Sequence, residues 1–491
     1  MILKAIFVVI LISLAGCGKR HVTRSAILFT PQCEIVPSPE IYPDTVAMAV
    51  FDPIDLEYAP WARNAGEQRL FGHLYETLIT VDCTGDVQAG LASSWDRSVD
   101  GRIWTFKVQK SARLWDGSPV TAEDVVWSWQ NAPVDPDAPD AVFDSVAADG
   151  ERTLRVYLKH PHWEVPRALS ALTFAVARPS SRFGWPLGSG PYEIEPTPIR
   201  SSGRHDGAIV LRPAFGARGS VILVVQTSSH DARDLLEGTV DIVVTRDPAV
   251  IEYASRRPLF ESVALPWDET YVLLSTSRVR ELLWGGSIGA VPKGLSDGLA
   301  RDAVRSDARG VRPPFWWQEL EHCGELSETV PGLPPFPRGA YSSGGARRII
   351  FDRQDPTARG LAERLVALAA TDTAASTPAA TLASAVPGVN SGSSALIAEG
   401  VTARELRSSL QDGDDFAYIV VVKRRPPDSC DETGKLLQRA PWLAPLGDRL
   451  SRAPIPLVDT RRHVIVRSDV AGLVVDWYGN LMVANETLQT R

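Results

Sequence analysis

The sequence predicts an α/β protein whose later half builds a partly parallel sheet. Two segments, 103–109 and 153–158, alternate apolar and polar side chains with the period of a half-buried strand. From 348–351 to 416–422 the chain reads strand, helix, loop, helix, strand, an order typical of parallel strands joined by crossover helices. With 491 residues the chain has room for two or more large units.

The earlier elements follow from local patterns. The β-branched and apolar run at 45–51 predicts a first strand. Leu70, Leu74 and Leu78 recur every four residues, so we expect a helix that buries one leucine face. No internal repeat is visible.

Two capping boxes mark helix starts. Thr121 and Asp124 stand three residues apart before an apolar run, and Thr402 and Glu405 repeat the arrangement. In such a box the hydroxyl accepts from an early helix amide, and the acidic side chain accepts from the amide of the capping residue. Helices are therefore predicted to follow both threonines.

A third helix start lies in the later half. Asp355-Pro356 supplies a capping carboxylate and a proline at the first helical position, so a helix to about residue 370 is expected. Between 371 and 394 the composition falls to Ala, Ser, Thr, Pro and Gly. That segment is interpreted as a loop or a degraded strand region.

Composition and charge exclude several classes of protein. Hydrophobic residues make up 44% and charged residues 22%, which is ordinary for a globular chain and unlike a disordered or multi-span membrane protein. The formal net charge is -8. Such a chain offers no global basic field, so no nucleic-acid partner is expected.

The N-terminus has the order of a secretory signal. Lys4 precedes the apolar run 5–14, which is too short to span a bilayer. Leu14-Ala-Gly-Cys17 then resembles the lipobox of bacterial lipoproteins, which implies cleavage before Cys17 and a lipid on that cysteine. The alternative is a plain secretory signal in which Cys17 is incidental.

Four further cysteines remain for an exported and therefore oxidising setting. Two lie early, Cys33 and Cys83, and two lie late, Cys323 and Cys430. Four cysteines allow three pairings, and proximity along the chain favours Cys33–Cys83 with Cys323–Cys430. Buried free thiols are the alternative. No C-x-x-C pair occurs, so no structural zinc or other metal site is predicted.

Four motifs stand in one order within about sixty residues: Leu74-Tyr-Glu-Thr-Leu78, Gly90-Leu-Ala-Ser-Ser-Trp95, Asp100-Gly-Arg-Ile-Trp-Thr-Phe106 and Trp115-Asp-Gly-Ser-Pro-Val-Thr-Ala-Glu-Asp124. Further matches are Gly188-Ser-Gly-Pro-Tyr192 and Leu236-Glu-Gly-Thr-Val-Asp241. The set resembles the family 5 extracellular solute-binding proteins, the oligopeptide, dipeptide and nickel receptors of ABC importers. The match is good from about 45 to 277 and weak afterwards, so the second lobe is divergent.

The resemblance implies a two-lobed fold of the type II periplasmic-binding-protein kind, which closes on ligand about a hinge. Its crossings are expected near Ser275 and Arg452. The chain then divides into a signal peptide at 1–16, a lipid-anchored tether at 17–44, lobe I at 45–275 with an extra subdomain at 59–188, lobe II at 276–454 and a return to lobe I at 455–491.

The function implied by the resemblance is capture of a peptide or peptide-like small solute for an ABC permease with its ATPase. We expect an exported monomer, held through its lipid alone on the periplasmic side or the outer face of the cytoplasmic membrane. Zinc-protease, phosphate-loop and dinucleotide motifs are absent and no nucleophile-elbow pattern is expected, so neither an enzyme nor a cofactor is predicted. The alternative is a non-transport lipoprotein that uses the scaffold as a sensor, chaperone or protein-interaction surface.

Ligand contacts are assigned by position in this family pattern. They lie before the helix of Leu74, after a strand at 240–244, before the hinge, and in a Pro-rich loop that could cover the opening. Aromatic faces there suit variable side chains through non-directional contact. The candidates are Trp61, Asn64, Glu67, Thr245, Arg246, Trp267, Asp268, Trp316 and Trp317.

One further candidate departs from the family. Peptide-binding members end a lobe II strand with a pattern similar to Ala-Asp-Tyr-Pro-Asp-Pro, whose first Asp pairs with the ligand's α-amino group. Here the strand at 418–422 runs into Lys423-Arg-Arg-Pro-Pro, which places Arg425 at that Asp. A guanidinium would repel an ammonium and attract a carboxylate or phosphate. The alternative is a solvated turn in another register.

Overall fold

The computed structural model describes residues 33–37, 41–132, 143–159, 161, 165–180, 184–195, 208–227, 232–238, 240–275, 347–375, 396–412, 417–423, 455–468, 470 and 472–486. Helices and strands alternate along these ranges and the strands form sheets of ten, four, three and two strands, which confirms the α/β class. None of the helices in these ranges combines the length and the apolar character needed to cross a membrane.

The ten-stranded sheet organises the molecule, in the order β15-β14-β16-β13-β17-β12-β2-β11-β10-β9. β14 runs parallel to both β15 and β16, which confirms the partly parallel sheet predicted for the later half. The strands are β2 Thr45–Val50, β9 Tyr192–Ile194, β10 Ile209–Pro213, β11 Val221–Gln226, β12 Ile242–Thr245, β13 Phe260–Ser275, β14 Arg347–Asp352, β15 Leu396–Val401, β16 Ala417–Lys423 and β17 Ile455–Arg467.

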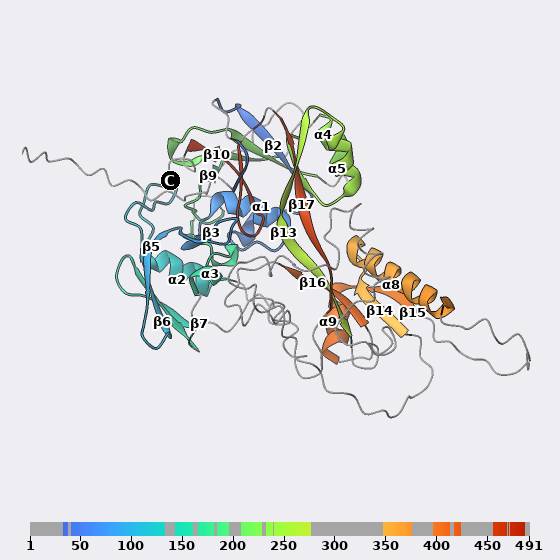
Figure 1. Cartoon of the computed structure of the whole chain (residues 1–491). Helices are drawn as coiled ribbons and strands as arrows, with labels where there is room; N and C mark the ends of the chain where they lie inside the picture. The colour runs from blue at the N-terminus through green and yellow to red at the C-terminus, as the bar shows by residue number, and fades with distance from the viewer. Residues whose placement is uncertain are drawn as a thin grey trace, which may run out of the picture.

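Two strands of this sheet, β13 and β17, run from one hydrophobic core into another. They pair antiparallel from Phe260 opposite Arg467 to Leu273 opposite Ile455. Figure 1 shows the pair descending from the body that holds α1, α4 and α5 to the body that holds α8 and α9. One strand pair therefore serves two separately packed units.

The helices cover the sheet on both faces at each end. In the first body α1 (Ala65–Leu74) packs on one face, and α4 (Ala232–Leu236) and α5 (Pro248–Ser255) on the other. In the second body α8 (Pro356–Ala375) and α9 (Ala403–Asp412) take opposite faces. Each end of the sheet thus buries both of its apolar faces, as strands with near-continuous apolar runs require.

The packing of β13 bears on the proposed boundary between the two lobes. Leu265 belongs to the core of the first body, whereas Tyr271 and Leu273 belong to the core of the second. The chain therefore leaves the first core several residues before Ser275. The other expected crossing, near Arg452, lies outside the described residues.

A separate core fills the expected extra subdomain. Its antiparallel sheet has the order β5 (Ala92–Arg97), β6 (Ile103–Val108), β8 (Thr153–Leu158), β7 (Phe143–Ala148). β6 and β8 confirm the two alternating strands predicted, and Trp104, Phe106 and Val108 are buried in this core. It is completed by the hairpin of β3 (Ile79–Val81) and β4 (Val87–Ala89), by α2 (Ala122–Gln130) and by α3 (Val165–Ala168).

The predicted leucine helix is shorter than expected. α1 ends at Leu74 because the next residue, Tyr75, is extended, so Leu78 lies outside the helix. Leu70 and Leu74 are buried in the core of the first body, while Leu78 is buried in the core of the subdomain. The four-residue spacing of these leucines therefore predicted a single helix face, although the leucines are buried in two different cores.

All three predicted helix starts are confirmed. Thr121 and Asp124 make a reciprocal capping box on α2, and Thr402 accepts from Glu405 N while Glu405 accepts from Thr402 N. Asp355 Oδ1 accepts from the amides of residues 357 and 358 at the start of α8. α8 extends to Ala375, into the segment expected to be irregular.

The early disulfide is confirmed, and it shortens the expected tether. Cys33 and Cys83 are bonded at 2.03 Å. β1 (Glu34–Val36) adds to β18 (Leu473–Val475), which also pairs with β19 (Leu481–Val483). Residues 33–36 are thus part of the folded body, not of a tether reaching residue 44. Cys323, Cys430 and Cys17 lie outside the described residues.

A buried histidine joins α1 to the C-terminal strands. His73 is fully buried; its Nδ1 lies 2.8 Å from Arg69 O and its Nε2 lies 3.1 Å from Val483 N. The amide of Val483 can only donate, so Nε2 accepts and Nδ1 carries the proton. Burial lowers the pKa of His73 to about 4, and the nearby Arg69 cation acts in the same direction.

We predict that His73 makes folding stability fall on acidification. Its pKa is depressed in the folded state, so between pH 6.5 and 4 the unfolded chain binds the extra proton, at a cost of up to about 3 kcal/mol. H73Q keeps an acceptor for Val483 N but does not titrate. Urea midpoints at several pH values should therefore fall less steeply in H73Q than in the wild type, and equal slopes would contradict the assignment.

Removing the disulfide should destabilise the first body. The bond joins residues 50 apart, and closing a loop of that length restricts the unfolded chain by about 4 kcal/mol in the loop-entropy treatment. The double variant C33A/C83A should lose up to that much free energy of unfolding in urea titrations. Intact mass after thiol alkylation checks the bond itself, and alkylation of either cysteine in the unreduced native protein would disprove it.

Candidate functional site

β13 and β17 become polar where they pass between the two cores. Trp267-Asp-Glu-Thr270 in β13 lies beside Asp459-Thr-Arg-Arg462 in β17, and both strands are mainly apolar on either side. We call these eight residues the crossing section. The register shifts twice on β13 within this region, between Ala264 and Trp267 and between Trp267 and Glu269, as at β-bulges.

Asp268 is the centre of an ion cluster in the crossing section. Its Oδ2 accepts from Arg246 Nη2 at 2.7 Å and lies 2.8 Å from Arg462 Nε. Arg246 Nη2 also lies 3.0 Å from Glu269 Oε2. Burial alone would lower the pKa of Arg246, but the carboxylates of Glu269 and Asp268 outweigh it and raise that pKa. The guanidinium is therefore held charged between two carboxylates.

Arg462 connects the ion cluster to the first body. Its Nη2 donates to Tyr478 O at 3.1 Å and to Gly479 O at 3.2 Å, in the turn between β18 and β19. Arg69 of α1 is also buried and donates to Ala49 O at 3.3 Å. Burial, together with the charge of Arg462, lowers the pKa of Arg69 to about 10.

Tyr271 carries the chain of polar contacts into the second body. Its hydroxyl donates to Asp355 Oδ2 at 2.9 Å. Asp355 is the carboxylate that caps α8, so one side chain ties β13 to that helix. Burial first, then the charges of Glu269 and Asp355, raise the pKa of Tyr271. The tyrosine thus stays a neutral donor.

Four buried atoms of this region have no hydrogen-bond partner among the described residues. They are Arg246 Nε, Asp268 Oδ1, Thr460 Oγ1 and Arg462 Nε, the last of which is close to Asp268 but lacks hydrogen-bond geometry. An unsatisfied buried polar atom costs about 1–3 kcal/mol. The charges of the cluster are therefore paired, but some of its buried polar atoms lack a hydrogen bond among the described residues.

The crossing section has a second set of polar contacts. Thr270 Oγ1 donates to Asp459 Oδ1 at 2.5 Å, and both residues are fully buried. The guanidinium of Arg461 lies 4.4 Å from the centroid of the Trp267 ring, a cation–π contact. Trp267 therefore contacts Arg461, while its neighbour Asp268 contacts Arg246.

Of the predicted contacts, Asn64 and Glu67 have structural roles at α1. Asn64 Oδ1 accepts from Glu67 N at 2.8 Å and caps the helix. The fully buried Glu67 accepts from Arg63 N and Nη2, at 2.8 and 2.6 Å, and from Asp55 N at 3.1 Å. Burial opposes ionisation of Glu67, but these hydrogen bonds lower its pKa. Glu67 lies in the first helical turn, not before the helix.

The remaining described candidates divide in the same way. Thr245 ends β12, rather than following a strand, and accepts from Asp247 N at 3.0 Å before α5. The Trp61 ring lies 6.0 Å from that of Trp127, and its buried Nε1 has no hydrogen-bond partner among the described residues. Arg246 and Asp268 are brought into direct contact. Trp316, Trp317 and Arg425 lie outside the described residues.

Sequence reasoning missed Arg462, Glu269 and Arg69. A signal for the first was present: Asp459-Thr-Arg-Arg462 interrupts an apolar strand with four polar residues. Such an interruption in both crossing strands marks a place where the sheet has polar partners. The contribution of Arg69, which reaches the site from α1, has no comparable local signal.

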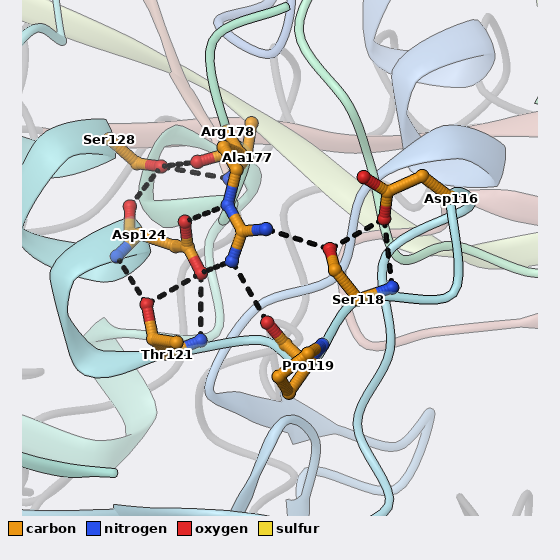
Figure 2. A network of polar contacts seen from close by, with 8 residues as sticks. All are labelled: Asp116, Ser118, Pro119, Thr121, Asp124, Ser128, Ala177 and Arg178. Carbon is orange, nitrogen blue, oxygen red and sulfur yellow. Dashed lines mark hydrogen bonds and ion pairs between the residues drawn. The ribbon is translucent and has the colours of Figure 1, made fainter. Parts of the chain in front are cut away.

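The motif at 115–124 helps to hold the subdomain together. Figure 2 shows the Arg178 guanidinium clamped between the start of α2 and the turn before it. Its Nε and Nη2 donate to the two carboxylate oxygens of Asp124 at 2.6 and 2.7 Å, and Nη1 donates to Ser118 Oγ at 2.7 Å. Because Asp124 also caps α2, one ion pair fixes the helix, the turn and the segment of Arg178.

A second motif has a packing role. In Gly188-Ser-Gly-Pro-Tyr192, Gly190 N donates to Leu74 O at 2.9 Å, and Trp115 N donates to Gly188 O at 3.1 Å. A Cβ on either glycine would overlap Leu74 O. These glycines allow the chain to pass directly against the end of α1, which explains the motif without a ligand.

Two observations concern metal and nucleophile motifs. No group of three or more His, Cys, Asp and Glu side chains in the described part of the chain could hold a metal ion. Gly285-Gly-Ser-Ile-Gly289 has the spacing of a nucleophile elbow, contrary to the expectation of no such pattern, but it lies outside the described residues. The short pattern acquires meaning only in a strand–turn–helix with His and acid partners.

Comparison with known proteins shows what part of this chain is similar to a family. Residues 86–200 match the family described as bacterial extracellular solute-binding proteins, family 5 Middle. The periplasmic oligopeptide-binding protein OppA of Escherichia coli (strain K12) is 41% identical over 85 residues, which are 17% of this chain and 14% of OppA. The resemblance to solute-binding protein family 5 is thereby confirmed. The periplasmic murein peptide-binding protein MppA of the same organism is 41% identical over 83 residues, 16% of this chain and 15% of MppA.

Solved structures show a likeness in fold over most of the chain. NikA from Brucella suis in complex with Fe(III)-EDTA superposes with a TM-score of 0.61 at 16% identity, covering 89% of this chain and all of NikA. MppA in its unliganded open form gives 0.57 at 14% identity, covering 92% of this chain and 99% of MppA. At these identities the likeness shows the fold alone, and it confirms the two-lobed, type II periplasmic-binding-protein architecture.

We predict that Arg178 stabilises the subdomain. In R178M the nearly buried carboxylate of Asp124 loses its cation, which should cost about 3 kcal/mol of unfolding free energy. The matched control is R155M, which breaks the exposed ion pair with Asp149 and should cost less than about 1 kcal/mol. Urea unfolding followed by tryptophan fluorescence measures both, and equal losses would contradict the structural role.

Proposed function

We propose that the chain is the lipid-anchored substrate-binding protein of an ABC importer, capturing a peptide or peptide-like solute between its lobes and delivering it to a permease. The family 5 match at residues 86–200 carries this proposal. The matched curated relatives are substrate-binding proteins, not enzymes, and several are named for peptides: oligopeptides, a murein peptide and D,D-dipeptides. The aligned segments span only about one seventh of OppA and MppA, so ligand and partners come from this inference.

The proposed anchor is a lipid on Cys17. Cys33, where the disulfide attaches the chain to the body, lies sixteen positions after Cys17. At about 3.4 Å per extended residue, this leash reaches at most about 55 Å. A receptor attached through a segment of this length stays on the exported side of the membrane, close to the permease.

The ligand is proposed to be anionic at one end. In the family register Arg425 replaces the Asp that pairs with a ligand ammonium. The side chains proposed to line the ligand are Trp61, Trp267, Trp316 and Trp317, with Arg246 and Asp268 at the crossing and Arg425 in lobe II. A guanidinium offers a planar pair of donors that matches a carboxylate.

Native mass spectrometry of the chain from Gly18 onward, exported without its lipid, tests the proposal. Mass spectra before and after gentle denaturation should show a stoichiometric peptide or small anion released from the wild type. Addition of peptide pools to the emptied protein should restore the bound mass.

The variant R425D tests the charge of the ligand. The variant should lose the preference for a ligand with a carboxylate and gain a preference for one with a free ammonium. R155M, which breaks an exposed ion pair with Asp149, should bind as the wild type does. A wild type that carries nothing and ignores peptide pools would contradict the importer assignment and favour the second candidate, a non-transport lipoprotein that binds other proteins.

A further inference from the structure

We propose that the Asp268-centred ion cluster is the device that sets how freely the two lobes rotate about the crossing section. The inference rests on the proposed function, because a receptor that closes on ligand needs a defined hinge. It concerns the ligand-free protein, however, and its test needs no ligand. The residues that act are Asp268 and Glu269 of β13, Arg462 of β17 and Arg246, which follows β12.

The cluster lies where the strand pair has little apolar packing. Leu265 belongs to the first core and Tyr271 to the second, so the residues between them belong to neither. Hydrophobic contacts are non-directional, whereas paired charges hold a particular geometry. Ion pairs at this position therefore determine an angle between two bodies whose cores do not reach it.

The cluster is tied to the first body, and β13 is tied to the second body a short distance further along the strand. Arg462 donates to the carbonyls of Tyr478 and Gly479, which belong to the first body. Two residues beyond Glu269, Tyr271 donates to the carboxylate that caps α8 in the second body. The register shifts around Trp267 let the strand bend between these two attachments. A rotation of one body against the other must therefore change the distances around Asp268.

Charge makes Asp268 the member whose loss matters most. Its carboxylate is 9% exposed and contacts both Arg246 and Arg462. Arg69 adds a third guanidinium close enough to Arg462 for their charges to interact. Replacing the carboxylate by an amide leaves these cations less compensated in a site shielded from water, so their repulsion pushes the segment away from its present geometry.

The test is the distribution of distances between the lobes in ligand-free protein. Spin labels on non-natural residues at the exposed positions 255 in α5 and 363 in α8 leave the native cysteines intact. Pulsed electron spin resonance should show one dominant distance in the wild type. In D268N the population at that distance should fall by about tenfold relative to other distances, the size of a typical coupling between two sites.

The matched control is D149N, which removes a carboxylate from the exposed pair with Arg155 and should leave the distribution unchanged. A D268N protein that melts like the wild type and keeps the wild-type distribution would overturn the proposal. If D268N does not fold, R246Q takes its place: Asp268 keeps Arg462, so the same broadening should appear to a smaller extent, and an unchanged distribution overturns the proposal. Neither result depends on whether a peptide is bound, so the importer assignment stands or falls separately.

Discussion

The antiparallel pairing of β13 with β17 is the constraint on which the rest of the structure depends. Both strands are more than twice as long as most of their neighbours. They connect two cores that are covered by different helices. β17 returns from the second body to lie between β13 and β12, so the last described strands lie in the same body as the first. Because β13 and β17 cross between the bodies side by side in one sheet, a rotation of one body against the other would bend a two-stranded ribbon rather than a flexible linker.

Much of the local structure could be predicted because it depends on local chemistry. A hydroxyl and a carboxylate three residues apart, as at Thr121 and Asp124, satisfy helix amides in any fold, and the period-two pattern of 103–109 indicates a strand wherever it lies. The errors came where two distant parts decide the outcome. Leu78 keeps the helical spacing but belongs to another core, and β1 acquires its strand partner from the C-terminal end of the chain.

The candidate site was predictable in position rather than in contacts. Arg246 and Asp268 were selected from their places after one strand and before the hinge, and they meet because β12 and β13 both flank β17. Asn64 and Glu67 were selected by the same reasoning, yet their polar atoms serve the start of α1. Position along a family pattern does not distinguish a carboxylate that faces a ligand from one that completes a helix.

Stability is distributed unequally, and the distribution suits a molecule that moves at one place. A disulfide, the Arg178 clamp and His73, which lies between α1 and β19, stabilise the first body and its subdomain. The crossing section, together with Arg246, instead holds charges in balance, and four of its buried atoms have no hydrogen-bond partner among the described residues. Regions with incomplete buried hydrogen bonding lie at the low end of local stability. Any rotation of one body against the other would therefore act on the residues around Asp268, because apolar packing closes the cores on either side.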